Sequence, residues 1–229
     1  MTVGTTSGEG IADWPTALLF DWDNTLVDSW GTIHDAVNTT LSAMGLPAWT
    51  MTETRERVRQ SLRDSFPRMF GDRWPEARRI YLEAFEAIHL QRLTPLPGAT
   101  ELVADLAEAG FYLGLVSNKT GRLLRREVEV LGWSALFGRV IGAGDAPADK
   151  PDPAPVDLAL GDSGITRGAQ VWFVGDTGID MACARNAGCV GVLIHPAVPV
   201  LTPGEFDDAP PALAFTDCAA LGRYLLARH

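Results

Sequence analysis

Lysine is nearly absent from this 229-residue chain. Seventeen of its 19 basic residues are arginine, and the two lysines are Lys119, shortly after an apolar run, and Lys150, directly before a proline. Lysine carries a compact point charge, whereas arginine carries a planar guanidinium with different hydration and geometry. Two lysines in a chain that otherwise uses arginine are therefore candidates for a chemical role. The competing interpretation is a bias toward arginine that left two lysines by chance.

Other absences exclude several classes of protein. The three cysteines are odd in number and form no CxxC pair, which indicates free thiols in a reducing cytoplasm. The four histidines show no zinc-ligand spacing, so no zinc site is expected. No run of about 18 apolar residues exists, so no membrane span is expected. The net charge of −10 argues against binding nucleic acid or an anionic membrane. The start of the chain is rich in Gly, Thr and Ser and lacks signal-peptide features, so we expect a flexible tail over 1–15 and a cytoplasmic protein.

Short apolar runs alternate with helical patterns along most of the chain. The helical patterns over 101–109, 121–131 and 178–187 are each followed by a glycine, a common helix stop. Strands alternating with helices predict a parallel sheet covered by helices. We therefore expect an α/β fold with a Rossmann-like core over 16–28 and 98–229. Its strands are expected at the apolar runs 17–20, 111–116, 139–141, 171–174 and 190–194.

The interval from 29 to 97 has a different, purely helical pattern, and roughly 70 residues are too many for one crossover between strands. An apolar stripe runs from Trp30 to Met44, a second helix is expected over 52–63, and a third begins at Pro75. Nine arginines and eight acidic residues give this interval a net charge of +1, against −11 for the remainder. We expect an inserted helical domain whose charge suits an anionic substrate, with solvated helix surfaces as the alternative.

Carboxylates follow two of the predicted strands. Asp21 and Asp23 come directly after the first apolar run, and a second pair, Asp176 and Asp180, follows the fourth. Ligands of parallel α/β sheets bind beyond the carboxyl ends of the strands, so these acids are expected at one site. Four carboxylates can lie this close together only where positive charge offsets the repulsion between them. Oxygen ligands with few protein partners suit Mg²⁺, and Lys150 is expected to neutralise the remaining charge.

These residues together resemble the haloacid-dehalogenase superfamily of phosphohydrolases. Phosphoglycolate phosphatase-like members are the most similar, and the interval 29–97 lies where the superfamily places its helical cap of the first kind. Asn24 stands where glycine is more common. The resemblance implies a Mg²⁺-dependent phosphatase acting on a small phosphorylated metabolite. It spans 17–195 and rests on four ordered motifs: Asp21-x-Asp23-x-Thr25, Ser117-Asn118, Lys150 and Gly175-Asp176-x-x-x-Asp180.

The resemblance assigns roles to the first motif. Asp21 is expected to be the nucleophile that takes the phosphoryl group as an aspartyl-phosphate, which divides one displacement into two. Asp23 is expected to protonate the leaving oxygen and then to deprotonate the attacking water. Both are also expected at the metal, Asp21 through its carboxylate and Asp23 through its backbone carbonyl. Thr25 is expected to orient Asp23 through a hydrogen bond.

The remaining motifs are expected to hold the metal and the phosphoryl group. The resemblance makes Asp176 the direct carboxylate ligand of Mg²⁺, with Asp180 behind it, holding Lys150 or a metal-bound water. Ser117 and the backbone of Asn118 are expected to bind the phosphoryl oxygens. Lys150 and the metal are expected to neutralise the charge on those oxygens, which is the main catalytic effect in phosphoryl transfer.

The acid at Asp23 disfavours two branches of the superfamily, the dehalogenases and the phosphonate-cleaving enzymes, because both lack an acid at this position. The phosphonate-cleaving branch also needs a lysine in its cap, and the interval 29–97 contains none. A phosphotransferase of the β-phosphoglucomutase kind keeps both acids and a helical cap, so the sequence leaves it open. A non-catalytic binding module on the same scaffold is disfavoured by the filled motif positions. The oligomeric state is left open.

The substrate is expected to be read by the cap. Arg55, Arg59 and Arg63 are spaced by four residues and share one face if 52–63 is one helix. Arg59 and Arg63 are the favoured contacts, because they lie late in this helix, next to an expected break at 65–67. A guanidinium there would bind a small carboxylate through two hydrogen bonds. A solvated stripe paired with neighbouring acids is the competing interpretation.

Overall fold

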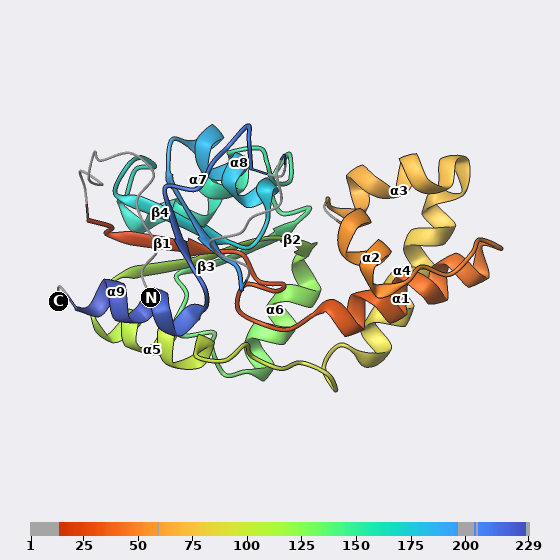
Figure 1. The fold of residues 1–229 in the computed structure, drawn as a ribbon, viewed down its shortest axis with the longest axis horizontal. Helices are drawn as coiled ribbons and strands as arrows, with labels where there is room; N and C mark the ends of the chain where they lie inside the picture. Colours follow the sequence, from red (N-terminus) through yellow and green to blue (C-terminus); the bar gives the residue numbers. More distant parts are fainter. Residues whose placement is uncertain (1–13, 59, 197–203, 205, 228–229) are drawn as a thin grey trace. The chain divides into compact units, whose positions relative to one another are not determined.

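The structure, a computed structural model, describes residues 14–58, 60–196, 204 and 206–227 (Figure 1). The chain divides into two compact units. The smaller, helical unit is Asp28–Thr94, and the larger unit comprises the described residues on either side of it. Each unit is described by itself. Of the tail expected over 1–15, all but the last two residues lie outside the described part of the chain.

The larger unit is built on a parallel sheet, which confirms the predicted α/β fold with a Rossmann-like core. Among the described residues the strand order is β3-β2-β1-β4-β5-β6, and each neighbouring pair runs parallel. The central strand β1 is buried at every position, as expected where helices cover both faces of a sheet. The strands are β1 (Ala17–Phe20), β2 (Tyr112–Thr120), β3 (Arg139–Ala143), β4 (Val171–Gly175), β5 (Val190–Ile194) and β6 (Leu213–Phe215).

Helices lie on both faces of this sheet (Figure 1). On one face α7 and α8 bury Val156 and Ala184 against Leu19 and Phe173 of the central strands. On the other face α5 and α9 pack side by side. The helices are α5 (Ala99–Glu108), α6 (Gly121–Val130), α7 (Ala154–Leu160), α8 (Gly178–Ala187) and α9 (Cys218–Leu226), with a short 3₁₀ turn η2 (Gly161–Ser163) after α7.

Strand β2 is longer than its apolar run predicts. The run ends at Val116, but the strand continues to Thr120, which pairs with Ala143 of β3 after a shift in register. The polar motif residues 117–119 therefore form the end of the strand itself. The edge strand β6 was not predicted, because three residues at the sheet edge carry too short an apolar pattern to signal a strand.

The smaller unit, within its described residues, consists of helices and their connections. Helix α1 begins after Ser29, buries Ile33, Val37 and Leu41 of the predicted stripe, and packs along α4. The two ends of the unit lie side by side, since the Asp28 N–H donates to the Thr94 carbonyl at 2.9 Å. In the described part of either unit, no helix is both long and apolar enough to span a membrane. The elements are α1 (Trp30–Ala43), α2 (Met51–Arg57), α3 (Leu62–Phe70), a 3₁₀ turn η1 (Gly71–Arg73) and α4 (Trp74–Ile88).

The single helix predicted over 52–63 is wrong. Helix α2 ends at Arg57 and α3 begins after Ser61, whose carbonyl accepts the N–H of Ser65 and whose hydroxyl donates to Asp64. Ser followed by Asp three residues later is a helix-start pattern that the periodicity concealed. The predicted break at 65–67 is also wrong, because α3 continues through Pro67 and buries Phe66 beside it.

Candidate active site

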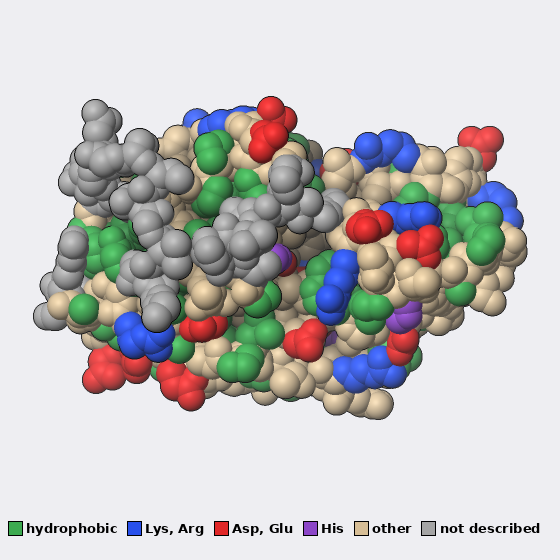
Figure 2. Space-filling model, in the orientation of Figure 1, with side chains coloured by type: hydrophobic (Ala, Val, Ile, Leu, Met, Phe, Trp, Pro, Cys, Tyr) green, Lys and Arg blue, Asp and Glu red, His purple; other side chains and the backbone are tan. Residues whose placement is uncertain are grey.

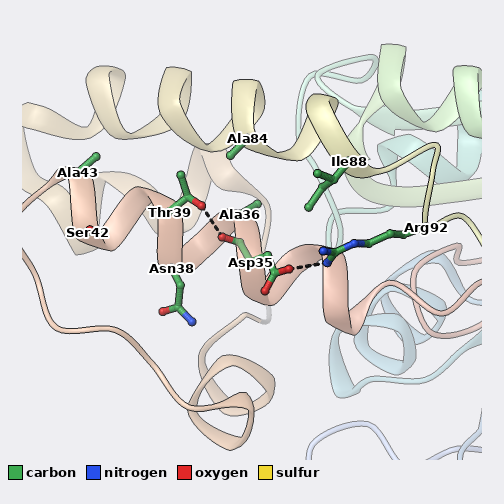
Figure 3. A pocket seen from close by; sticks show the side chains of 9 residues that line it. All are labelled: Asp35, Ala36, Asn38, Thr39, Ser42, Ala43, Ala84, Ile88 and Arg92. Carbon is green, nitrogen blue, oxygen red and sulfur yellow. Dashed lines mark hydrogen bonds and ion pairs between the residues drawn. The ribbon is translucent and has the colours of Figure 1, made fainter.

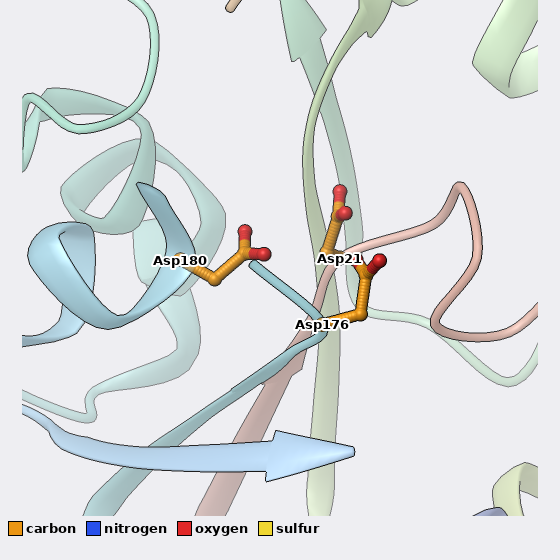
Figure 4. Close-up of side chains that lie close together, drawn as sticks. All are labelled: Asp21, Asp176 and Asp180. Carbon is orange, nitrogen blue, oxygen red and sulfur yellow. The ribbon is translucent and has the colours of Figure 1, made fainter. Parts of the chain in front are cut away.

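Strands β1 and β4 bring two of the predicted acids to the same edge of the sheet. The strands are neighbours, with Phe20 opposite Val174, and the Asp21 N–H donates to the Val174 carbonyl at 2.8 Å. Asp21 and Asp176 therefore leave the sheet side by side. Figure 4 shows the carboxylates of Asp21, Asp176 and Asp180 close together, and one oxygen from each lies within 4.8 Å of the others. We refer to these three residues as the carboxylate cluster.

Lys150 binds two members of the carboxylate cluster. Its Nζ lies 2.8 Å from Asp21 Oδ1 and 2.7 Å from Asp180 Oδ1, and its side chain is buried. Burial by itself lowers the pKa of a lysine, but Asp180 and Asp21 together outweigh burial and raise the pKa of Lys150. Its ammonium is therefore charged at neutral pH. Asp180 holds Lys150, which is one of the two alternatives that the sequence predicts.

Asp180 is also held by the start of α8. The N–H and the hydroxyl of Thr177 both donate to Asp180 Oδ2, at 3.0 and 2.6 Å. A Cβ at Gly175 would lie 2.3 Å from Asp180 Cγ, so this position tolerates no side chain while Asp180 stays in place. Glycine at the end of β4 thus lets the Asp180 carboxylate pack against the strand backbone.

The carboxylate cluster fits a divalent cation. Burial is the main cause that raises the pKa of Asp21 to about 6, with Lys150 opposing the shift and Asp180 adding to it. Burial, followed by repulsion from Asp180 and Asp21, raises the pKa of Asp176 well above its usual value. One ammonium is thus too little positive charge for three carboxylates. Carboxylate oxygens are the ligands that hard divalent cations prefer, so Asp21 and Asp176 are suited to hold one.

Asp23 has a different environment from the carboxylate cluster. Its Oδ1 accepts a hydrogen bond from Lys119 Nζ at 2.6 Å. Burial by itself lowers the pKa of Lys119, but Asp23 and Glu127 outweigh burial and raise it, so this ammonium is charged. The structure therefore gives the second of the two lysines a partner in the first motif, which the sequence did not indicate.

The predicted contact between Thr25 and Asp23 is wrong. Thr25 Oγ1 instead donates to Asp176 Oδ1 at 3.2 Å. After β1 the chain turns back, and the Thr25 N–H donates to the Trp22 carbonyl at 3.3 Å. Asn24 takes a φ of 63° in this turn, a conformation that glycine adopts freely and asparagine tolerates better than most residues. The turn thereby directs Thr25 toward β4.

The end of β2 contributes Ser117 and Asn118. The Asn118 side chain binds the backbone of Lys150 twice: its Nδ2 donates to the Lys150 carbonyl at 3.0 Å and its Oδ1 accepts the Lys150 N–H at 2.9 Å. The role expected from the sequence concerned only the backbone of Asn118. The contact of its side chain was not foreseen, because it joins residues 32 positions apart along the chain. Ser117 is buried, and its Oγ accepts the Lys119 N–H at 3.3 Å.

Sequence reasoning missed Glu127. Its carboxylate is buried on α6, where Oε2 accepts hydrogen bonds from Lys119 Nζ at 2.7 Å and from Trp22 Nε1 at 2.6 Å. The signal was available: Glu127 lies at helical spacing from Leu124 and directly before Val128, within the apolar face of the helix. A charged residue in such a face has to be paired.

The single helix that would align the arginines proposed as substrate contacts is not formed. Arg55 and Arg63 lie on separate helices, Arg63 is exposed, and Arg59 lies outside the described residues. Other arginines of the helical unit pair with nearby acids, such as Arg57 with Glu53 at 3.0 Å. Figure 2 shows acidic and basic side chains interspersed on the visible surface of this unit. The geometric reason for favouring Arg59 and Arg63 is therefore lost.

The helical unit also has an open groove between α1 and α4 (Figure 3). Its lining is mostly small and polar, from Ala36 and Thr39 on α1 to Ala84 on α4. At one end Asp35 Oδ2 and Arg92 Nη1 form an ion pair at 2.5 Å. The two charges offset each other, so the groove offers an anionic substrate no net attraction.

A comparison with known families identifies the chain. The family model described as haloacid dehalogenase-like hydrolase matches residues 18–194. The chain belongs to this family. The match extends from β1 to the end of β5 and includes the carboxylate cluster, Lys150 and the helical unit, so the predicted resemblance is confirmed.

Curated relatives and solved structures agree with this family. A phosphoglycolate phosphatase of Photorhabdus laumondii is 30% identical over 181 residues, which cover 76% of this chain and 77% of the relative. One of Psychrobacter arcticus is 29% identical over 227 residues, covering 91% and 95%. The structure of CbbY from Rhodobacter sphaeroides in complex with phosphate has a TM-score of 0.75 at 21% identity, over 91% of this chain and 96% of that one, and shares the fold. The family and the phosphatase relatives confirm the predicted enzyme class, a hydrolase of phosphoric monoesters.

Proposed function

We propose that this hydrolase is a Mg²⁺-dependent phosphatase that cleaves a small phosphorylated metabolite through an aspartyl-phosphate at Asp21. The observation that carries the proposal is the position of the Asp21 carboxylate, paired with Lys150 and adjacent to Asp176 at one edge of the sheet. A nucleophilic carboxylate beside a buried ammonium suits the approach of an anionic phosphoryl group, since Lys150 offsets the repulsion between the two anions.

The reaction proceeds in two displacements. In the first, an Asp21 oxygen forms a bond to phosphorus while the bond to the leaving oxygen breaks, and Asp23 gives its proton to that oxygen. In the second, a water oxygen forms a bond to phosphorus, Asp23 takes the water proton, and the bond between Asp21 and phosphorus breaks. Inorganic phosphate and an alcohol are the products, and both carboxyl groups return to their initial state.

The chain's residues are suited to hold a metal ion in this reaction. Asp21 and Asp176 supply carboxylate oxygens, the Asp23 backbone supplies a carbonyl, and Thr25 orients Asp176 through its hydrogen bond. When bound, Mg²⁺ neutralises charge on the transferring phosphoryl group. Ser117 and the Asn118 backbone bind the phosphoryl oxygens, while the Asn118 side chain keeps Lys150 in place.

The proposed substrate is phosphoglycolate or a metabolite of similar size and charge. The curated relatives named as phosphoglycolate phosphatases support this choice. We propose that residues 29–97 act as the cap that reads the leaving group, because nearly all of them belong to the separate unit Asp28–Thr94, whose two ends are adjacent. The net charge of +1 over 29–97 favours an anionic leaving group. Arg59 and Arg63 stay candidate contacts on their charge alone, without the shared helical face that first favoured them.

The test is phosphate release from phosphoglycolate and a panel of small phosphate esters, with and without Mg²⁺. The wild-type protein is expected to release inorganic phosphate only with the metal. Asp21→Asn is expected to lose activity by several orders of magnitude, with its melting temperature retained. Near wild-type turnover by Asp21→Asn would refute the nucleophile assignment. A product carrying the phosphoryl group on a second metabolite, instead of free phosphate, would favour a phosphotransferase.

A further inference from the structure

A buried hydrogen-bonded chain connects the first motif to α6. Lys119 Nζ donates to Asp23 Oδ1 at 2.6 Å and to Glu127 Oε2 at 2.7 Å, and Trp22 Nε1 donates to the same Glu127 oxygen at 2.6 Å. Trp22 and Asp23 are consecutive residues. The contacts therefore form a closed loop, from the Asp23 carboxylate through Lys119, Glu127 and the indole of Trp22 back to the Asp23 backbone.

The members of this loop are packed tightly. The Lys119 side chain is 5% exposed and the Glu127 side chain 2%, whereas that of Asp23 is 19% exposed. Trp22 is fully buried and packs edge-to-face on Trp133, with ring centroids 5.7 Å apart. A buried carboxylate and a buried ammonium are tolerated only when each is paired, so Glu127 and Lys119 hold one another in a defined position. Asp23 is thus the end of the loop that faces solvent.

The choice of lysine agrees with this arrangement. The chain uses arginine at all but two basic positions, and Lys119 is one of the two exceptions. An ammonium contacts single oxygens of two different carboxylates as a compact charge, whereas a planar guanidinium matches one carboxylate through two parallel bonds. The geometry at Lys119, with one bond to Asp23 and one to Glu127, is the one that lysine makes easily.

We propose that Lys119, anchored by Glu127 and Trp22, is a positioning residue that directs the Asp23 carboxyl toward the oxygen of the leaving group. The inference rests on the proposed function, in which Asp23 serves that oxygen. Asp23 lies two residues after Asp21, and, after burial, repulsion from its carboxylate is among the causes that raise the pKa of Asp21, so its carboxyl lies near a group bound at the nucleophile. Without Lys119 the partly exposed Asp23 side chain would lose the bond that holds its Oδ1 in place.

The experiment compares two substrates on the same protein sample. An alkyl phosphate needs a proton on its leaving oxygen, whereas a nitrophenyl phosphate leaves readily without one. Lys119→Met is expected to lower kcat/KM for the alkyl substrate about 100-fold and for the nitrophenyl substrate less than threefold. The ratio of the two values is independent of how much protein is folded. A merely structural role would lower both values equally, and that outcome would overturn the proposal.

Matched variants test the route through Glu127. Glu127→Gln is expected to shift the substrate ratio in the same direction, because Gln still accepts the Trp22 N–H but no longer carries a charge to hold Lys119. Glu129→Gln is the control on the same helix, since Glu129 is exposed and pairs with Arg126. It is expected to leave the ratio unchanged. A ratio that Glu129→Gln shifts as much as Glu127→Gln would overturn the specific role of the buried pair.

A double-variant cycle separates this proposal from the proposed function. In an Asp23→Asn background, Lys119→Met is expected to have little further effect on the alkyl substrate, because Lys119 acts through Asp23. Additive losses would overturn the positioning role while leaving the acid role of Asp23 intact. If Asp23→Asn itself lowers both substrates equally, the acid role fails first and the positioning role fails with it.

Discussion

Substitution of Gly175 by alanine tests how closely the site is packed. A Cβ at this position would lie 2.3 Å from Asp180 Cγ and 2.6 Å from Asp180 Oδ2, far inside van der Waals contact. Asp180 has little freedom to move aside, because Lys150 holds Oδ1 at 2.7 Å and Thr177 holds Oδ2. One methyl group is therefore expected to displace the carboxylate that keeps Lys150 against Asp21.

Two quantities are expected to fall in Gly175→Ala: the free energy of unfolding, because the added methyl group overpacks the site, and the turnover, because Lys150 is displaced. Added methyl groups in a well-packed site cost about 1–3 kcal/mol of unfolding free energy. For a chain of this length, that is a fall of roughly 2–12 °C in melting temperature. A catalytic group misplaced by about 1 Å lowers turnover on the order of 100-fold. Gly175→Ala is thus expected to lower turnover on the order of 100-fold while the protein stays folded at room temperature.

The assay is phosphate release alongside thermal denaturation. Gly31→Ala is the control, because a Cβ at Gly31 meets no heavy atom within 4 Å and the position lies in the first turn of α1. This variant is expected to keep its activity and to melt at the wild-type temperature or slightly above. If Gly175→Ala keeps both kcat and melting temperature, the strand end moves aside at little cost and Asp180 does not set the position of Lys150.

Three further predictions concern the metal, Thr25 and the thiols. Saturating Mg²⁺ is expected to raise the melting temperature, since a hundredfold excess over Kd adds about 2.7 kcal/mol to the free energy of unfolding. Asp176→Asn should abolish this increase, and an unchanged increase in that variant would place the metal elsewhere. Thr25→Val is expected to weaken Mg²⁺ activation by at least tenfold, because Asp176 loses the hydrogen bond that orients it, whereas an unaltered Mg²⁺ titration would contradict this role. Burial raises the pKa of Cys183 and of Cys218 to about 12, so about one in 10⁴ of these thiols is ionised at pH 8. A thiol reagent should therefore react slowly with both until the protein is unfolded, and rapid reaction of more than one thiol in the native protein would refute their burial.

The order of motifs along the chain is readable without a structure because each follows an apolar run or lies in the loop after one. In a parallel sheet every strand delivers its next residue to the same edge, so Asp21 and Asp176 meet regardless of loop details. The helix ends are readable for a similar reason, as at Gly188, which takes a φ of 69° after α8. Where periodicity alone was available, over 52–63, the prediction of one helix is wrong.

Local sequence by itself determined the strands other than β6, most helix ends and the acids that converge at the edge of the sheet, because hydrophobic period and stop residues act over a few positions. Only the tertiary structure decided the partners of the polar side chains. Thr25 binds Asp176 across 151 positions, and Lys119 binds Asp23 across 96. Nothing near either residue encodes such a contact. It arises when a turn directs a side chain toward a strand that is adjacent in space and distant in sequence.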